Sequence, residues 1–139
     1  MDSATDKECK INMMKTLTLQ ILPDNFAIWQ LPPNAPLPKI DDSSFWSVTR
    51  TPEELSVVSI AKHAPSDARK ESVWRCIGVK GPLEFELTGI LASLSAPLAE
   101  AGISIFAISS FNTDYLLVKA EQLELSCRAL ELAGYTFTD

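Results

Sequence analysis

The stretch GILASLSAPLAEAGISIFAISSFNTDYLLV, residues 89–118, predicts one helix followed by two strands. Four of its apolar residues recur at helical spacing and form a single stripe: Leu91, Leu94, Leu98 and Ala101. A stripe of this period is typical of a helix that packs one face on a core. Thr88 stands before the stripe as a candidate N-cap, and Gly102 follows it as the expected helix end.

Pro97 lies inside this predicted helix, where a proline removes one backbone hydrogen bond at a cost of ~3 kcal/mol. We expect a kink at this residue, or a second helical segment capped by Ser95. The segments ISIFAISS (103–110) and DYLLVK (114–119) are predicted strands, and FNT forms a tight turn between them.

The same alternation of elements continues on both sides of this stretch. VWRCIGVK (73–80) is apolar on both faces, as expected of a central strand. EQLELSCRALELAG (121–134) has the spacing of a second helix that ends at Gly134, and YTFT (135–138) is a short last strand. The order β-α-β-β-α-β predicts an α+β, ferredoxin-like architecture, with an antiparallel sheet and both helices on one face.

The first half of the chain repeats this pattern in part. Its predicted strands are residues 15–22, 26–31, 45–50 and 55–60. FAIWQLPPNAPLPK takes the place of the first helix, because its prolines exclude a regular helix. A shift of 60 residues lays WSVTRTPEELSVV over FAISSFNTDYLLV without a gap and pairs Glu54 with Asp114. We therefore predict two tandem units of one fold, the first without a regular first helix.

Changes in composition divide the chain into four parts. Residues 1–14 are polar and without period, which predicts a disordered tail. Residues 15–61 form a degenerate N-terminal unit, and residues 62–72 form a polar linker. Residues 73–139 form a complete C-terminal unit.

The composition argues against several classes of function. Of the 139 residues, 46% are hydrophobic and 22% are charged, as in ordinary globular domains. The net charge of −6, without a cluster of Lys and Arg, argues against a nucleic-acid or anionic-membrane surface. We find neither a signal sequence nor an apolar run of the ~18 residues that span a bilayer, so we expect a cytoplasmic protein.

The sequence contains no evident catalytic or metal-binding set. The three cysteines, Cys9, Cys76 and Cys127, are widely spaced and suit reduced thiols. His63 is the only histidine, and its polar surroundings are typical of an exposed loop. We therefore expect no enzymatic activity, no metal and no cofactor.

Two places could hold a ligand: the loop that enters the first helix of the C-terminal unit, and the turn at 110–114. A helix N-terminus offers unpaired N–H donors and a positive dipole end, and Gly89 leaves the backbone open to a carboxylate. Asp114 could accept hydrogen bonds from an ammonium or guanidinium group, with Phe111 over the apolar part of the ligand. The ordinary alternative is that these residues are only a helix cap and a turn.

Residues 89–118 strongly resemble one branch of the ACT-domain proteins, as do WRCIGVKGPLEF (74–85) and FWSVTRTPEELSVV (45–58). This branch includes the cytosolic arginine sensors of the mTOR pathway and small bacterial and fungal relatives. The resemblance covers roughly residues 15–138, and ISSFNTDYLLV is close to diagnostic. It implies a regulatory module that binds an amino acid at an interface between ACT units.

By position, the resemblance implies these ligand-binding residues: Thr88, Gly89, Ile90, Ser110, Phe111, Thr113 and Asp114. Asp114 is the implied acidic contact to a ligand nitrogen, and the implied ligands are amino acids, including arginine and other basic ones. The sensors contain four ACT units and this chain at most two, so an equivalent site requires a homodimer or a different pairing. We expect no complete second site beside Glu54, since the N-terminal unit lacks the helix-entry loop.

The leading hypothesis is a non-enzymatic, cytoplasmic regulatory protein that binds an amino acid and acts as a sensor. The alternative is a protein-interaction adaptor, in which the ACT pair only dimerises or docks on a partner enzyme or signalling complex. Exposed Trp29 and Trp46 side chains would favour this adaptor, but packing of both side chains in the core is the favoured interpretation.

Overall fold

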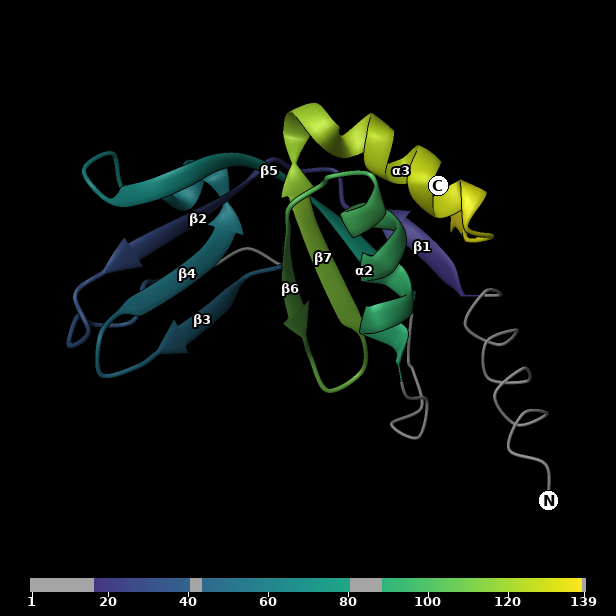
Figure 1. The fold of residues 1–139 in the computed structure, drawn as a ribbon. Helices are drawn as coiled ribbons and strands as arrows, with labels where there is room; N and C mark the ends of the chain where they lie inside the picture. The colour runs from purple at the N-terminus through teal and green to yellow at the C-terminus, as the bar shows by residue number, and fades with distance from the viewer. Residues whose placement is uncertain (1–16, 41–43, 81–88, 139) are drawn as a thin grey trace, which may run out of the picture. The chain divides into compact units, whose positions relative to one another are not determined.

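The computed structural model describes residues 17–40, 44–80 and 89–138. These residues form two compact units, drawn in Figure 1. The C-terminal unit consists of residues 17–22 and 76–138, and the inserted unit consists of residues 23–75. The inserted unit thus interrupts the C-terminal unit in sequence.

The C-terminal unit has the predicted ferredoxin-like order of elements. It contains β1 (Thr18–Ile21), the end of β5 (Arg69–Val79), α2 (Ile90–Glu100), β6 (Ile105–Ser109), β7 (Asp114–Lys119), the 3-10 helix η2 (Ala120–Gln122), α3 (Leu123–Leu132) and β8 (Thr136–Thr138). The strands pair in the order β6-β7-β5-β1-β8. The β-α-β-β-α-β order is therefore confirmed for β5 to β8, with β1 added between β5 and β8.

Strand β1 lies in a different unit from the one that its sequence position predicts. It pairs antiparallel with β5 and parallel with β8, although the composition assigns residues 15–22 to the N-terminal unit. Leu19 of β1 lies opposite Val79 and is fully buried in the core of the C-terminal unit. Alternating apolar residues identify a strand but leave its partners open, which is why the sequence misplaces this one.

The predicted linker also contains regular structure. The 3-10 helix η1 (Ala61–His63) follows directly on the preceding strand, and β5 begins at Arg69, within the predicted linker of residues 62–72. The units therefore divide between residues 22 and 23 and between residues 75 and 76, which differs from the boundaries predicted from composition. The polar residues at 66–71 are exposed, and a polar strand resembles a linker in sequence.

Both helices of the C-terminal unit cover the same face of its sheet. Ile90, Leu94 and Leu98 of α2 and Leu130 of α3 are buried in one cluster. The strand residues in this cluster occupy alternate positions: Leu19, Ile77, Val79, Leu116 and Val118. Because alternate residues of a strand point to the same side, the helices share one face, as predicted.

Helix α2 continues through Pro97 from Ile90 to Glu100. The predicted second helical segment at Ser95 is wrong, and the Ser95 hydroxyl instead donates to the Ala92 carbonyl at 3.3 Å. A proline removes one backbone hydrogen bond, whereas the apolar face of α2 remains buried along the whole helix. Burial of that face offsets the lost hydrogen bond.

Glycines set the ends of the helices. Gly89 is the N-cap of α2, with a φ of 79° in the left-handed region that favours glycine. The predicted cap, Thr88, lies outside the described residues. Gly102 and Gly134, with φ of 75° and 105°, follow α2 and α3 as predicted.

The inserted unit repeats the strand order of the C-terminal unit. It contains β2 (Phe26–Leu31), β3 (Ser47–Arg50), β4 (Leu55–Ile60), η1 and the beginning of β5. The order is β3-β4-β2-β5, and all of these neighbours are antiparallel. If β2 is counted as its first strand, this is the ferredoxin-like order 2-3-1-4. The hairpin of β3 and β4 is confirmed.

Irregular segments replace the helices of the inserted unit. Between β2 and β3, residues 32–40 and 44–46 contain no helix, as predicted. The Arg50 guanidinium holds this segment by donating hydrogen bonds to the carbonyls of Pro33 and Ala35, the second at 2.7 Å. Between β4 and β5, η1 is the one short helical turn within the described residues.

Trp29 belongs to the core of the inserted unit. Its side chain is 2% exposed and packs with Ala27 and Val57. Its indole N–H donates to the Ser59 hydroxyl at 2.9 Å in a buried hydrogen bond. The favoured interpretation of Trp29 as a core residue is therefore confirmed, whereas Trp46 is 40% exposed.

Replacement of Ser59 by alanine is expected to lower the free energy of unfolding by about 1–3 kcal/mol, because the Trp29 indole N–H loses its acceptor in the core. Urea unfolding followed by tryptophan fluorescence measures this change. The matched control is Ser56→Ala in the same strand, where Ser56 is half-exposed and a change within about 0.5 kcal/mol is expected. Equal effects of the two substitutions would contradict a structural role for the indole hydrogen bond.

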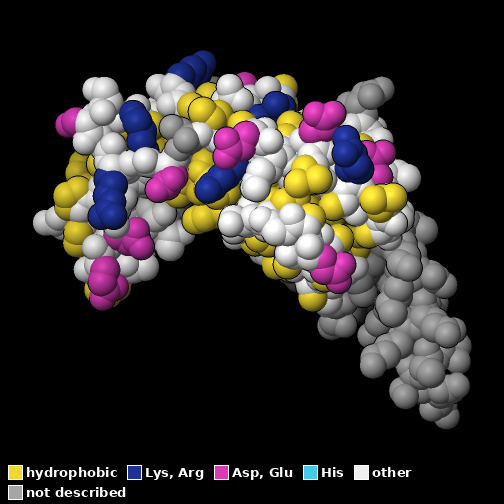
Figure 2. Space-filling model, turned by 45° about the horizontal axis from the view of Figure 1, so that its top comes forward, with side chains coloured by type: hydrophobic (Ala, Val, Ile, Leu, Met, Phe, Trp, Pro, Cys, Tyr) yellow, Lys and Arg dark blue, Asp and Glu magenta, His cyan; other side chains and the backbone are white. Residues whose placement is uncertain are grey.

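The surface of the described residues carries mixed charge. Figure 2 shows Lys and Arg side chains interspersed with Asp and Glu side chains on the face in view. This mixture agrees with the absence of a basic cluster in the sequence. Within the part of the chain that the structure describes, no helix is both long enough and apolar enough to cross a bilayer.

Candidate functional site

Hydrogen bonds between its two ends fix the turn between β6 and β7. The Ser110 N–H donates to the Thr113 carbonyl at 2.8 Å, and the Ser110 hydroxyl accepts from the Thr113 N–H at 3.3 Å. Phe111, within the turn, is 80% exposed. Asp114 is the first residue of β7 and pairs with Ser109. The turn therefore holds Asp114 at a defined place at the end of the sheet.

The side chain of Asp114 belongs to the helix-covered face of the sheet. Asp114 shares this face with Leu116 and Val118, because alternate residues of a strand point to the same side. Leu116 and Val118 lie in the core beneath α2 and α3. Asp114 itself is half-buried. Asp114 thus lies at the edge of the core between the helices and the sheet.

The start of α2 and the turn lie at the same end of the C-terminal unit. The Thr113 hydroxyl donates to the carbonyl of Val79, the last residue of β5. Helix α2 also begins at this end of the sheet (Figure 1). The sequence leaves open whether the start of α2 and the turn lie at the same end of one unit, and in the structure they do.

The predicted loop residues can offer their backbone to a ligand. Gly89 is exposed, whereas the Ile90 side chain is 6% exposed and packs in the core. Ile90 can therefore contact a ligand through its backbone N–H and not through its side chain. The first turn of α2 carries no acidic side chain, so its positive end is not neutralised from within the helix. Thr88 cannot be placed, since it lies outside the described residues.

Glu54 does not have the structural role of Asp114. The Thr51 N–H donates to the Glu54 carbonyl at 2.9 Å, as the Ser110 N–H donates to that of Thr113. The Thr51 hydroxyl likewise accepts from the Glu54 N–H at 3.2 Å. Glu54 is therefore the counterpart of Thr113, at the last position of its turn.

The two hairpins match with a shift of 59 residues rather than 60. Arg50 pairs with Leu55 as Ser109 pairs with Asp114. The counterpart of Asp114 is therefore Leu55, which is fully buried. The shift of 60 residues aligns the two carboxylates, Glu54 and Asp114, and is wrong by one residue. The hydrogen bonds that close the two turns determine which residues of the two hairpins correspond.

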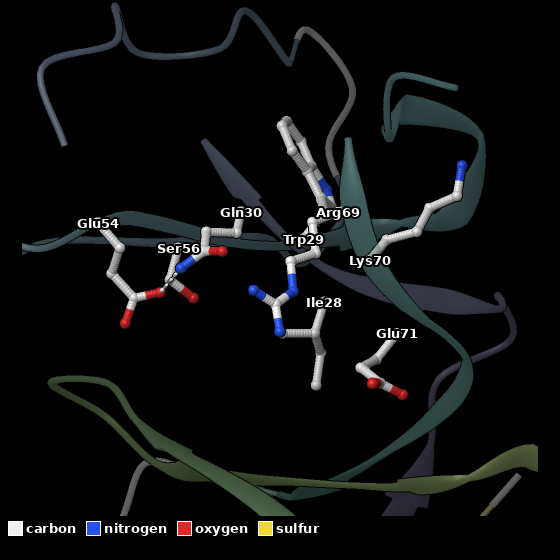
Figure 3. A pocket seen from close by; sticks show the side chains of 8 residues that line it. All are labelled: Ile28, Trp29, Gln30, Glu54, Ser56, Arg69, Lys70 and Glu71. Carbon is white, nitrogen blue, oxygen red and sulfur yellow. Dashed lines mark hydrogen bonds between the residues drawn. The ribbon is translucent and has the colours of Figure 1, made fainter. Parts of the chain in front are cut away.

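The inserted unit contains a hollow that the sequence does not predict. Its volume is about 390 Å³, and it is lined by Ile28, Trp29, Gln30, Glu54, Ser56, Arg69, Lys70 and Glu71. Figure 3 shows this lining and the hydrogen bond from Gln30 Nε2 to Glu54 Oε1, which is 3.1 Å long. The residues come from β2, β4, β5 and the turn before β4. The pairing of β2 with β5 brings these residues together. The sequence does not predict this pairing, because residues 62–72 have the composition of a linker.

Cys76 is not suited to act as a nucleophile. Its side chain is 0% exposed, and burial raises the pKa of its thiol to about 12. Its thiol is therefore protonated at neutral pH. Within residues 17–40, 44–80 and 89–138, no cluster of three His, Cys, Asp or Glu residues could hold a metal ion.

Comparison with protein-family models identifies the fold. The model described as ACT domain matches residues 69–131. A second model, described as an N-terminal domain, matches residues 24–67. Residues 69–131 therefore match the ACT-domain family.

The human protein named cytosolic arginine sensor for mTORC1 subunit 1 is 36% identical over 89 residues, which make up 58% of this chain and 27% of the sensor. The chain therefore spans only about a quarter of the length of this relative. Among solved structures, a protein of Agrobacterium tumefaciens is 36% identical with a TM-score of 0.83, over 88% of this chain and 92% of that protein.

The regulatory subunit of aspartate kinase from Thermus thermophilus shares the fold at a TM-score of 0.53 and 12% identity, over 79% of this chain and 93% of that chain. The human relative is named as a sensor. The predicted recognition of an ACT-domain protein is confirmed, as is the ferredoxin-like fold class.

Proposed function

We propose that this protein is a non-enzymatic regulatory protein that binds a free amino acid at the turn site, defined as the backbone at 88–90 together with Ser110, Phe111, Thr113 and Asp114. The observation that carries this proposal is the placement of the Asp114 carboxylate at the end of the C-terminal unit where α2 begins. A carboxylate and a positive helix end are complementary to the two charges of an amino acid.

Each part of the turn site has a distinct task in this proposal. The N–H groups at the start of α2 bind the ligand carboxylate, and Asp114 accepts hydrogen bonds from its ammonium or guanidinium group. The exposed Phe111 ring covers the apolar part of the ligand. The Thr113 hydroxyl acts as a positioning group, because its bond to Val79 holds the turn against β5.

The relatives support an amino acid as the ligand class, arginine and other basic amino acids included. The human relative is named as an arginine sensor, and arginine would place its guanidinium on a carboxylate such as Asp114. We also propose that a second copy of the chain completes the site, so that the functional form is a homodimer in the cytoplasm. Light scattering coupled to size exclusion, with and without ligand, measures the oligomeric state.

A thermal-shift screen with the proteinogenic amino acids, followed by isothermal titration, tests this function. A ligand at one hundred times its Kd is expected to stabilise the fold by about 2.7 kcal/mol. For a chain of this size, this corresponds to a rise in Tm of roughly 8 °C. A folded protein that binds none of these amino acids would contradict the proposal.

The alternative function is a protein-interaction adaptor. It is favoured by Leu125 and Leu132 on α3, which are 44% and 84% exposed. They lie two turns apart and share one helix face, which is the spacing of a docking surface. Affinity purification from cells grown with and without amino acids separates the two functions, because a sensor changes its partners with ligand and a constitutive adaptor keeps them.

A further inference from the structure

We propose that the hollow of the inserted unit is a second binding site, separate from the turn site, for a small zwitterion of the amino-acid type. The hollow is formed wholly by residues of the inserted unit. Its volume of about 390 Å³ falls in the range of small-molecule sites.

The strand register explains how the polar groups of the hollow come together. Gln30 of β2 lies opposite Ser56 of β4 on one side and Arg69 of β5 on the other. Ile28, two residues earlier, lies opposite Glu71. Since alternate residues share a face, these five side chains form two adjoining rows on one face of the sheet.

The segments that replace the helices pack on the opposite face of this sheet. There, Trp29 and Val57 are buried with Ile40, Ala64 and Ala68 around them. Figure 3 shows the Trp29 indole directed away from the side where Ile28 and the Arg69 guanidinium lie. The face that carries the hollow is therefore not the face that these segments cover.

Opposite charges lie side by side in the hollow. Arg69 and Glu71 are two residues apart on β5, which separates their backbones by roughly 7 Å. Glu54 adds a second carboxylate, one oxygen of which accepts from Gln30 at 3.1 Å. A guanidinium and two carboxylates around the half-exposed Ile28 complement a ligand with a carboxylate, an ammonium group and an apolar stem.

The same charges disfavour ligands of a single sign. An inorganic phosphate or other pure anion meets Glu54 and Glu71, and a pure cation meets Arg69. Discrimination by the hollow therefore depends on the presence of both charges on one small molecule. Free amino acids are the smallest abundant molecules of this kind.

Nuclear magnetic resonance of the 15N-labelled full chain tests this site, because the side-chain amide of Gln30 reports on the hollow. The Asp114→Ala variant is titrated to about 10 mM with each proteinogenic amino acid, and the best ligand is then compared with its amide and its N-acetyl form. We expect the Gln30 amide signals to shift with the free amino acid. Both derivatives, each lacking one charge, should bind at least about tenfold more weakly.

Two pairs of variants assign the effect to individual charges. Arg69→Gln and Glu71→Gln are each expected to weaken binding about tenfold. The matched controls Lys62→Gln and Glu53→Gln change exposed charges of the same unit that do not line the hollow, and they should leave the affinity unchanged. Thermal unfolding of each variant verifies that it is folded.

Three results would overturn the second site: no shift of the Gln30 signals with any amino acid, equal binding of the singly charged derivatives, or a response that Asp114→Ala abolishes. The last result would leave the turn site intact as the only one. The opposite result is also possible. If the amino acid shifts the Gln30 signals of Asp114→Ala but shifts no signals around Phe111 in either wild type or variant, the hollow is supported and the turn site is contradicted.

Discussion

Replacement of Asp114 by alanine is expected to abolish measurable binding of the amino acid at the turn site. Removing one partner of a charged hydrogen bond costs about 2–5 kcal/mol, which lowers the affinity roughly thirtyfold or more. Asp114 is half-buried at the start of β7 and outside the core cluster, so the ligand-free Tm should change by only a few degrees. Isothermal titration of the variant with the ligand found in the screen measures the affinity.

Two further substitutions sharpen this test. Asp114→Asn keeps the shape of the side chain and removes its charge, so it should lose affinity nearly as strongly as Asp114→Ala. Glu54→Ala removes a carboxylate at the turn of the other hairpin and should leave affinity at the turn site unchanged. If Glu54→Ala lowers this affinity as much as Asp114→Ala does, the assignment of the two turns is wrong.

Replacement of Leu130 by alanine should destabilise the C-terminal unit by about 2–5 kcal/mol. Leu130 is 0% exposed and joins α3 to the buried cluster beneath both helices. The substitution removes three carbon atoms from a packed interior and leaves a cavity. Urea unfolding followed by far-ultraviolet circular dichroism measures the change in the free energy of unfolding.

Leu132 provides the matched control, since it is on the same helix and is 84% exposed. Leu132→Ala should change the free energy of unfolding by no more than about 0.5 kcal/mol. A large loss with Leu132→Ala and a small one with Leu130→Ala would mean that α3 packs through the opposite face.

The C-terminal unit is predictable because its signals are local. The leucine stripe of α2 and the terminal glycines Gly102 and Gly134 define both helices without knowledge of their partners. The partner of a strand is not a local property, and β1 shows the consequence. Its alternation is correctly recognised, but its pairing with β5 and β8 depends on residues that lie more than fifty positions away.

The candidate sites differ in the same way. The turn residues Ser110–Asp114 are contiguous and belong to a motif, so the sequence can single them out. The hollow depends on the pairing of Gln30 with Arg69, and Arg69 lies in a segment whose polarity predicts a linker. The correct counterpart of Glu54 likewise emerges only from the hydrogen bonds that close the two turns.

Crystallisation of the protein with the amino acid found by the screen tests the turn site most directly. We predict a ligand nitrogen within hydrogen-bond distance of the Asp114 carboxylate and the ligand carboxylate at the backbone N–H groups of Gly89 and Ile90. A ligand bound with neither of these contacts, with Asp114 directed to solvent in the complex, would contradict it.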